Sequence, residues 1–246
     1  MKRALIIGGA NGIGLGIATE LANRNDIEKV YIVDKDILSK EFMNSKFETF
    51  QFNLLSNDYS FFNKFNDIDV LMITAGIGKL QLFKDVEEDT ISTLLNVNTI
   101  SAIRIIKKFY NKINSKDDFY CGVMVSIAGF MSSPFFSIYG ASKAALKIFI
   151  ESINVELLKD GVTNRVLNIS PGSIKGTGFN GNKTNLLEIA NLAREIIAHL
   201  QAKDDLFIPE YEEIYKTVLE RYHSDFRKEG EHSYDYKVNS GRVSSN

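Results

Sequence analysis

Short apolar runs alternate with longer segments of helical periodicity along most of the 246-residue chain. Several runs are apolar at consecutive positions, which is typical of strands buried on both faces of a parallel sheet. The pattern therefore predicts an α/β fold: a doubly wound parallel sheet in a single domain, with its functional site at the carboxyl ends of the strands. The expected strands are Arg3–Ile7, Lys29–Val33, Phe47–Phe52, Asp69–Thr74, Cys121–Ser126, Asn164–Ser170 and Leu206–Ile208.

Helical periodicity fills the segments between these strands. The expected helices are about Ile13–Asn25, Thr90–Asn114, Ser137–Leu158 with Ser137 as N-cap, and an amphipathic helix Glu210–Phe226. We expect residues 1–228 to form the domain and residues 229–246 to form a polar C-terminal tail. Because this tail carries aromatic residues, which are unusual in disordered segments, it is either disordered or docked on the same or a partner subunit.

Composition narrows the class of protein. A hydrophobic content of 44% is enough for a substantial core, and a net charge of −2 favours neither a nucleic-acid surface nor an anionic membrane. The single Cys121 and three histidines lack ligand spacing, so no metal site is expected. No apolar run approaches the ~20 residues of a membrane span, and the first run is better read as a strand than as a signal peptide. We expect a cytoplasmic protein.

A glycine-rich turn, Gly8-Gly9-Ala10-Asn11-Gly12-Ile13-Gly14, joins the first expected strand to the first helix. Glycines permit tight turns and close backbone approach, so the amide groups and the helix N-terminus can face a pyrophosphate. The alternative is an ordinary glycine turn. The strand–turn–helix context favours a dinucleotide site.

Asp34 closes the second expected strand, twenty residues past Gly14. A carboxylate at this place accepts hydrogen bonds from both hydroxyls of an adenosine ribose and repels a 2′-phosphate. Neither Asn11 nor Ile13 offers a cation to such a phosphate, so NAD is favoured over NADP. NADP is not excluded, because Lys35 either offsets Asp34 or is simply solvated.

The ends of the third and fourth strands supply further candidates for cofactor contact. Asn53-Leu54 would border the adenine, although a plain turn asparagine is an equal alternative. Small Ala75 and Gly76 would let a cofactor cross the edge of the sheet without a blocking side chain.

Tyr139 and Lys143 lie one helical turn apart, hence on the same helix face. An ammonium beside the phenol would favour its ionised form and lower a pKa of ~10, which makes the pair a possible general acid/base. Tyr31 and Lys35 have the same spacing, but in a strand four residues separate their backbones by ~13 Å. We expect the second pair to be coincidental.

Ser126 and Asn98 are the other polar candidates. Ser126 ends the fifth expected strand, where its hydroxyl could hold a substrate oxygen opposite Tyr139. No histidine lies near it in sequence, which disfavours an acyl-transfer triad. Asn98 lies among apolar residues, so it is either a satisfied core asparagine or the site of a kink whose freed backbone holds an ordered water beside the active site.

Together these residues resemble the short-chain dehydrogenase/reductase family over about residues 1–200. The resemblance rests on Gly8-x-x-x-Gly12-Ile13-Gly14 as cofactor loop, Asp34 as ribose ligand, the tetrad Asn98, Ser126, Tyr139 and Lys143, and Pro171-Gly172. It implies a Rossmann-like fold and hydride transfer between NAD(H) or NADP(H) and a small-molecule alcohol or carbonyl. The cofactor-binding residues it implies are Gly8, Asn11, Gly12, Ile13, Gly14, Asp34, Asn53, Leu54, Ala75, Gly76, Tyr139, Lys143, Pro171, Gly172 and Ile174.

The family's roles carry over residue by residue as implications of the resemblance. Tyr139 would be the general acid/base, and Ser126 would position the substrate oxygen. Lys143 would bind the nicotinamide ribose and lower the pKa of the tyrosine, and Asn98 would hold a water of the proton relay. Two other readings are a non-catalytic regulatory or scaffold protein of the same fold and a sugar-nucleotide epimerase or dehydratase, although the latter usually needs a larger C-terminal region.

Some positions depart from the family pattern. Ile7 and Ile73-Thr74 replace a threonine and a pair of asparagines, so we expect some hydrogen bonds that brace the glycine loop and the central strand to be missing. Thr177 lies one residue later than the carboxamide-binding threonine, which leaves the conformation of Ile174–Thr177 open. The stretch Gly176–Asn182 is either a mobile lid or a loose connection.

Substrate and assembly are the least determined features. An apolar pocket wall is expected from Phe130, Met131, Pro134, Phe135 and Phe136, and contacts to an anionic group from Lys79, Lys175 and Lys183. All of these are alternatively plain core or surface residues. The resemblance implies a homodimer or homotetramer formed through the two long helices.

Overall fold

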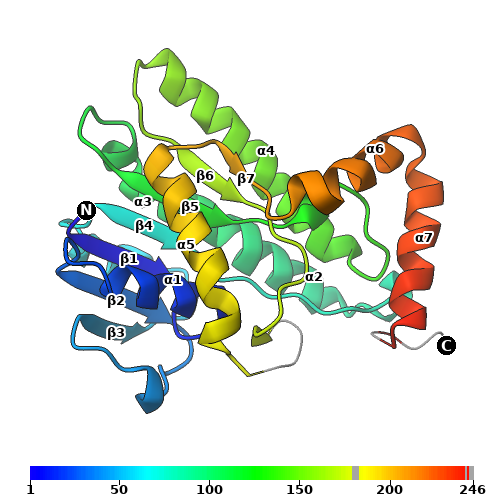
Figure 1. Ribbon diagram of the computed structural model, residues 1–246, viewed down its shortest axis with the longest axis horizontal. Coiled ribbons are helices and arrows are strands. Elements are labelled where there is room, and N and C mark those ends of the chain that lie inside the picture. Colours follow the sequence, from blue (N-terminus) through cyan, green and yellow to red (C-terminus); the bar gives the residue numbers. More distant parts are fainter. Residues whose placement is uncertain (179–182, 242, 244–246) are drawn as a thin grey trace.

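Seven parallel strands form one sheet in the computed structural model, which describes residues 1–178, 183–241 and 243 (Figure 1). The sheet order is β3-β2-β1-β4-β5-β6-β7, and the direction of winding reverses between β1 and β4. This order confirms the predicted Rossmann-like, doubly wound fold. The strands are β1 Arg3–Ile7, β2 Lys29–Asp34, β3 Phe47–Gln51, β4 Val70–Ile73, β5 Tyr120–Met124, β6 Val166–Ile169 and β7 Leu206–Phe207.

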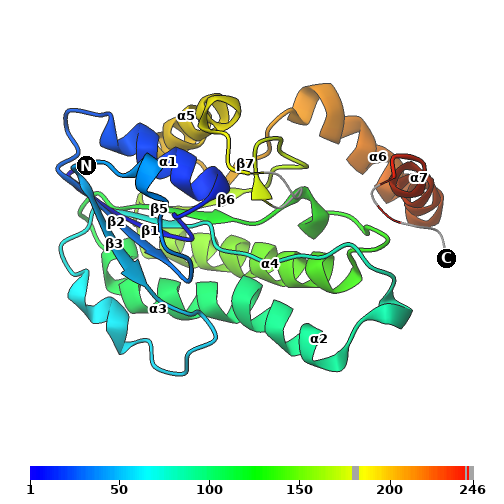
Figure 2. The same cartoon turned by 90° about the horizontal axis from the view of Figure 1, so that it is seen from below.

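Helices cover both faces of the sheet, as Figure 2 shows. On one face lie α1 Gly12–Ala22 and α5 Leu186–Ala202; on the other lie α2 Glu88–Leu95, α3 Ser101–Ile113 and α4 Ser137–Lys159. Strand β1 faces both layers, because Leu5 and Ile7 join one apolar core while Ala4 and Ile6 join the other. Burial on both faces explains why the strand is apolar at consecutive positions.

The long helix expected over residues 90–114 is interrupted around Asn98, for which a kink and a satisfied core asparagine were the two alternatives. Asn96–Ile100 forms a π-helical turn, η4, between α2 and α3, and Asn98 lies at its centre. A single π turn inserted into an α-helix locally widens the hydrogen-bonding pattern and is frequent at functional sites. The turn brings the Asn98 side chain to the sheet edge at which the site lies.

Several boundaries differ from the sequence predictions by a few residues. Pairing of β5 with β6 ends at Met124, opposite Ile169, so Ser126 lies two residues beyond the strand instead of at its end. Helix α1 ends at Ala22, not Asn25. The prediction of Ser137 as N-cap is wrong, because Phe136 holds the cap position and Ser137 is already helical.

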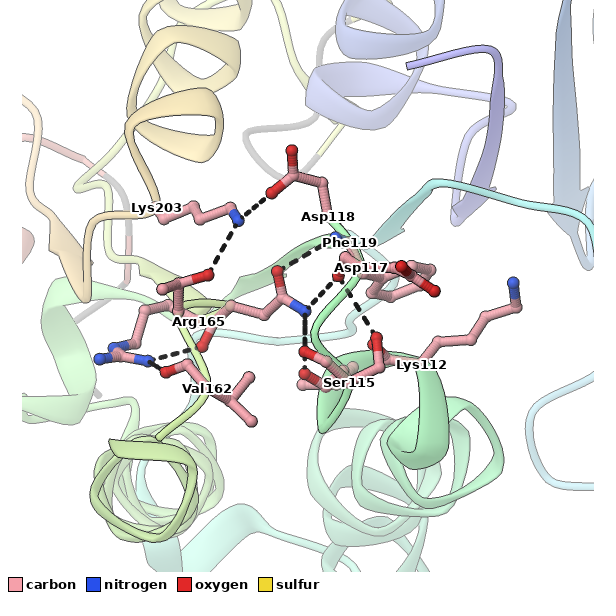
Figure 3. A network of polar contacts seen from close by, with 11 residues as sticks. Lys112, Ser115, Asp117, Asp118, Phe119, Val162, Arg165 and Lys203 are labelled. Atoms are coloured by element: carbon pink, nitrogen blue, oxygen red, sulfur yellow. Dashed lines mark hydrogen bonds and ion pairs between the residues drawn. The ribbon is translucent and has the colours of Figure 1, made fainter. Parts of the chain in front are cut away.

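A polar network joins the amino ends of β5 and β6, on the side of the sheet opposite the site (Figure 3). The buried amide of Asn164 donates a hydrogen bond of 2.8 Å to the Asp117 carbonyl and accepts one of 3.1 Å from the Phe119 amide. Lys203, which follows α5, forms an ion pair with Asp118. These contacts hold two strand-entry loops together and so fix the strands whose other ends carry the site.

The chain ends in a helical pair that lies beyond the carboxyl edge of the sheet (Figures 1 and 2). A π-helical turn, η7 Tyr211–Tyr215, leads into α6 Lys216–Ser224, and α7 Phe226–Asn239 follows. The helix predicted over residues 210–226 is thus found over Tyr211–Ser224, with a π-helical first turn. It ends at Asp225, whose carboxylate accepts hydrogen bonds from two amides of the first turn of α7. Helix α7 runs through the boundary expected between residues 228 and 229. Among the described residues, no helix is long and apolar enough to span a membrane.

Candidate active site

One cavity of about 1690 Å³ lies along the carboxyl ends of the strands. Single-ligand pockets are usually ~300–1,000 Å³, so this cavity has room for two molecules side by side. Every residue expected to contact a cofactor lines it: Gly8, Asn11, Gly12, Ile13, Gly14, Asp34, Asn53, Leu54, Ala75, Gly76, Tyr139, Lys143, Pro171, Gly172 and Ile174. The structure thus brings together residues from five different strand ends.

The glycine loop packs against the exit of β4 and leaves no space for a side chain at Gly8 or Gly14. A Cβ at Gly8, whose φ is +86°, would lie 2.4 Å from the Ala75 nitrogen, and a Cβ at Gly14 would lie 2.2 Å from the Gly8 carbonyl oxygen. Gly12 also has a positive φ, of +53°, and its amide donates a 2.9 Å hydrogen bond to the Thr184 hydroxyl. The loop therefore presents a bare backbone and a helix N-terminus, an arrangement that suits a pyrophosphate.

Thr74 supplies bracing that the sequence comparison led us to expect to be missing. Its hydroxyl lies 2.9 Å from the Ile7 carbonyl oxygen and 3.0 Å from that of Gly8. Whichever of the family's bonds are missing at Ile73-Thr74, this threonine ties β4 to the glycine loop directly.

Asp34 lies at the end of β2, and backbone amides orient its carboxylate. One oxygen accepts a 3.0 Å hydrogen bond from the Ala10 amide and the other a 3.1 Å bond from the Asp36 amide. The carboxylate is thus fixed at the rim of the cavity next to the glycine loop. Lys35 lines the same rim.

Asn53 follows β3 and uses its side-chain carbonyl locally. That oxygen accepts a 3.0 Å hydrogen bond from the Leu55 amide, which is the turn role weighed as an alternative from the sequence. The residue still lines the cavity beside Leu54.

Ser126 and Tyr139 meet at the base of the cavity. The Ser126 hydroxyl accepts a 3.1 Å hydrogen bond from the Ala128 amide and is also hydrogen-bonded to the Tyr139 phenol. Burial raises the pKa of Tyr139, and the hydrogen bond with Ser126 offsets part of this rise. The expected lowering of the tyrosine pKa is therefore not found, because desolvation outweighs any stabilisation of the phenolate.

Lys143 lies beneath this pair and is only 2% exposed. Its ammonium donates a 2.9 Å hydrogen bond to the Met124 carbonyl and lies 5.8 Å from the centre of the Tyr139 ring. Burial lowers the pKa of Lys143 to about 8. Since the ammonium donates to a carbonyl and not to the phenol oxygen, it stabilises the phenolate less than the helical spacing alone suggests.

Asn98 does not line the cavity but supports its wall. Its side-chain oxygen accepts a 2.8 Å hydrogen bond from the Ile77 amide, and its nitrogen donates to the Ile77 carbonyl at 2.8 Å and to the Ser142 hydroxyl at 3.0 Å. A Cβ at Gly76 would lie 3.3 Å from the Lys143 ammonium and 3.4 Å from the Asn98 oxygen. The amide therefore links the exit of β4 to α4 next to the lysine.

Tyr31 and Lys35, the second pair with the spacing of Tyr139 and Lys143, do not form a similar pair in the cavity. Tyr31 lies on β2 in an aromatic cluster, with its ring 5.3 Å from that of Phe65. It lies outside the residues that line the cavity, although Lys35 is among them.

The predicted substrate pocket is only partly correct. Met131 and Phe136 line the cavity, whereas Phe130, Pro134 and Phe135 do not. Among the three lysines considered for an anionic group, Lys79 and Lys183 line it and Lys175 does not.

The C-terminal helices form a wall that sequence reasoning did not assign to the site. The lining residues from this region are Ile214, Tyr215, Val218, Arg221, Glu229, His232, Ser233, Tyr236 and Lys237. A Cβ at Gly172 would lie 1.6 Å from the Tyr215 hydroxyl, so the glycine is what lets this phenol pack on the exit of β6. The amphipathic spacing of Ile214 and Val218 was the available signal, but it did not show which surface they cover.

The segment after β6 folds back over the glycine loop. Thr177 is buried, donates a 3.0 Å hydrogen bond to the Ile174 carbonyl, and lies next to Gly12. Residues 179–182 of the expected lid lie outside the described residues. Within the described part of the chain, no three His, Cys, Asp or Glu side chains are grouped as metal ligands would be.

Comparison with known proteins identifies relatives over most of the chain. A family model described as short chain dehydrogenase matches residues 2–187. An uncharacterised oxidoreductase, TDA5, of Saccharomyces cerevisiae is 26% identical over 217 residues, which are 80% of this chain and 64% of the yeast protein. Human 17-beta-hydroxysteroid dehydrogenase type 1 is 33% identical over 104 residues, 42% of this chain and 32% of the human enzyme. The chain thus matches less than two thirds of either relative's length.

Solved structures share the fold. A short-chain dehydrogenase/reductase of Burkholderia phymatum in complex with NAD matches with a TM-score of 0.77 at 15% identity, and the match covers 92% of this chain and 94% of that protein. At this identity the similarity shows the architecture alone.

The lowered pKa of Lys143 predicts a specific pH dependence of stability. Between pH 8 and the ordinary lysine value of 10.5, the unfolded chain binds more protons at this residue than the folded chain does. The free energy of unfolding should therefore rise with pH in this window, as the cost of burying the charge disappears. Relative to a Lys143→Met variant, urea unfolding should show the wild type gaining about 2 kcal/mol between about pH 7.5 and about pH 10. The assignment is contradicted if the free energy of unfolding of the wild type, relative to that of the variant, stays constant or falls over this window.

Proposed function

Because the chain belongs to the short-chain dehydrogenase family, we propose that it interconverts a hydroxyl and a carbonyl on a small-molecule substrate with a nicotinamide nucleotide, and that Tyr139 is the general acid/base. The observation that carries the proposal is the hydrogen bond between Ser126 and Tyr139 in a cavity whose other end is the bare glycine loop. The buried Lys143 ammonium lies beneath the pair.

Tyr139, Ser126 and Lys143 have different roles at the reacting oxygen of the substrate. The nicotinamide, when bound, supplies or accepts the hydride. Tyr139 gives a proton to the substrate oxygen in reduction and takes it back in oxidation, while Ser126 donates a hydrogen bond to the same oxygen. The raised pKa of Tyr139 keeps the phenol protonated at neutral pH, which suits the reductive direction. Lys143 holds a ribose hydroxyl and offsets the negative charge when the proton has left.

The residues present fit a dinucleotide. Side chains are sterically impossible at Gly8 and Gly14, so backbone amides of the loop approach the phosphates, and the N-terminus of α1 adds its partial positive charge. The Gly12 amide, now bonded to Thr184, is the donor that a phosphate oxygen would take over. The Asp34 carboxylate is oriented to accept hydrogen bonds from the adenosine ribose, so NAD is the preferred form.

Self-association is the second part of the proposal. On the outer side of α4, Ile148, Val155 and Leu158 are all more than half exposed. Their spacing of seven and three residues places them along one stripe of the helix, and exposed apolar stripes of this kind commonly mark protein interfaces. We propose a homodimer or homotetramer that buries this stripe. The cytoplasmic location expected from the sequence stays a prediction.

Replacing the catalytic phenol should separate binding from chemistry. Tyr139→Phe should bind NADH with a dissociation constant within about twofold of the wild type, because the ring and its packing remain, and should lose at least about a hundredfold in kcat. The matched control is Tyr31→Phe, which alters a tyrosine with the same lysine spacing outside the cavity. Fluorescence titration with NADH measures the dissociation constant. NADH oxidation across a carbonyl panel rich in apolar ketones measures kcat for both variants. Turnover by Tyr139→Phe at the wild-type rate refutes the role, and cofactor binding without turnover by any form favours a regulatory protein.

The preference for NADH over NADPH follows from the negative charge of Asp34 at the end of β2. NADH should bind at least about tenfold more tightly than NADPH, a difference of ~1.4 kcal/mol, because a 2′-phosphate would face the Asp34 carboxylate. Asp34→Asn should shrink this ratio by relieving the repulsion. Fluorescence titration with each nucleotide decides the point: tighter binding of NADPH to the wild type overturns the reading of Asp34.

The assembly proposal predicts a change of mass on introducing charge into the stripe. Val155→Glu should shift the protein towards the monomer in light scattering, because the charge would be buried in the interface. Glu195→Ala, an exposed position on α5 at the opposite face of the sheet, should leave the mass unchanged. A monomeric wild type at micromolar concentration rules the interface out.

A further inference from the structure

The loop that leads into the catalytic tyrosine contains a strained residue. Phe135 has a φ of +68°, in the left-handed region that bulky side chains rarely adopt, and its side chain is buried. Such a conformation persists only where the surrounding structure enforces it, and it is concentrated at functional sites. Phe135 lies four residues before Tyr139. Contacts that hold Phe135 in this conformation therefore also affect the position of the active-site tyrosine.

Helix α7 is one of the elements that hold this loop. The ring of Tyr234 packs on the ring of Phe135, with their centres 4.7 Å apart. On the other side, the Phe135 carbonyl accepts a 2.9 Å hydrogen bond from the Gln81 amide, which follows β4. The strained residue is therefore held by contacts to α7 and to the segment that follows β4.

A second contact from α7 fixes the residues just before Phe135. The Lys237 ammonium is buried and donates hydrogen bonds to the Ser133 hydroxyl at 2.8 Å and the Pro134 carbonyl at 2.9 Å. A third bond, of 2.9 Å, joins it to Ser233 on its own helix. The ammonium thus connects one turn of α7 to both backbone and side chain of the loop, a hundred residues earlier in the sequence.

Helix α7 is itself held in place, so it can act as a support. Arg221 on α6 pairs with Glu229 on α7 through two hydrogen bonds of 2.7 and 3.0 Å, and the Glu229 side chain is only 11% exposed. Asp225 caps the first turn of α7. The two helices therefore form one braced unit above the cavity.

Phe136, the residue after Phe135, contacts the catalytic tyrosine directly. The Phe136 ring lies 5.1 Å from that of Tyr139, and the Phe136 carbonyl accepts a 2.7 Å hydrogen bond from the Gly140 amide. We propose that Tyr234 and Lys237 are positioning residues, which hold Phe135 in its left-handed conformation and thereby fix Phe136 against Tyr139. The inference rests on the proposed role of Tyr139 for its catalytic consequence, but the structural coupling stands apart from it.

Hydrogen exchange tests the coupling without any activity. Tyr234→Ala and Lys237→Met should each speed amide exchange in peptides covering residues 130–140 by about tenfold, while peptides of the glycine loop stay unchanged. Tyr234→Phe keeps the ring that packs on Phe135 and should match the wild type, as should Asp235→Ala, which alters a neighbouring exposed side chain on the same helix. Unchanged exchange at 130–140 in both Tyr234→Ala and Lys237→Met overturns the proposal.

Kinetics then test the consequence for catalysis. Tyr234→Ala should lower kcat about tenfold while the dissociation constant for NADH stays within about twofold, because only the alignment of Tyr139 is altered. Tyr234→Phe should restore the wild-type kcat. A wild-type enzyme without turnover would defeat the proposed function and leave the exchange result standing. An active wild type with unchanged kcat in Tyr234→Ala would defeat the positioning role instead.

A double variant tests whether Tyr234 acts on the active site through Phe135. Glycine adopts a φ of +68° without steric cost, so Phe135→Gly removes both the strain and the ring that Tyr234 holds. In that background, adding Tyr234→Ala should change kcat by less than about twofold, whereas independent effects would multiply. A full additional tenfold loss contradicts coupling through Phe135. If Phe135→Gly does not fold, the exchange comparison of Tyr234→Ala with Tyr234→Phe decides the proposal.

Discussion

Burying the ammonium of Lys143 costs free energy, and the close approach of α4 to the end of β5 is what makes the burial possible. The Met124 carbonyl gives the ammonium a partner at 2.9 Å, and a Cβ at Gly129 would lie 2.9 Å from the Lys143 backbone. The same approach sets Tyr139, one turn earlier, against Ser126. Gly76 completes the arrangement, since its missing side chain leaves room for the ammonium from the other side. The geometry of the site thus depends on a lysine whose charge is expensive to keep.

Much of the fold follows from local pattern. Consecutive apolar residues in β1 are explained by burial on both faces, and Gly8 and Gly14 after it are explained by contacts that exclude any Cβ. An amide among apolar residues needs partners, which is the satisfied core asparagine weighed as one alternative for Asn98, and it finds them at Ile77 and Ser142. These features are set by residues close in sequence or by repeating periods, which is why they can be read from the chain.

Other features depend on contacts that no local pattern contains. Helical spacing placed Lys143 beside Tyr139, but burial decides the direction of the tyrosine's pKa shift, and burial depends on the whole cavity. Thr74 looked like a loss of bracing, yet its hydroxyl reaches two carbonyls across to β1. The wall formed by α6 and α7 depends on pairings such as Lys237 with Ser133, which are about a hundred residues apart. Amphipathic spacing shows that such a helix packs, but not against what.

The most direct test of the central claim, that Tyr139 and the glycine-loop end of the cavity work as one oxidoreductase site, is isotope transfer. A carbonyl substrate found in the panel would be reduced with NADH carrying deuterium at the reactive C4 position, and the product alcohol would be analysed by mass spectrometry. The account predicts one deuterium on the carbinol carbon of each product molecule formed by the wild type, and at least about a hundredfold less labelled product in the same time from Tyr139→Phe. Oxidation of the cofactor without deuterium in the product, or equal labelling by the variant, would contradict it.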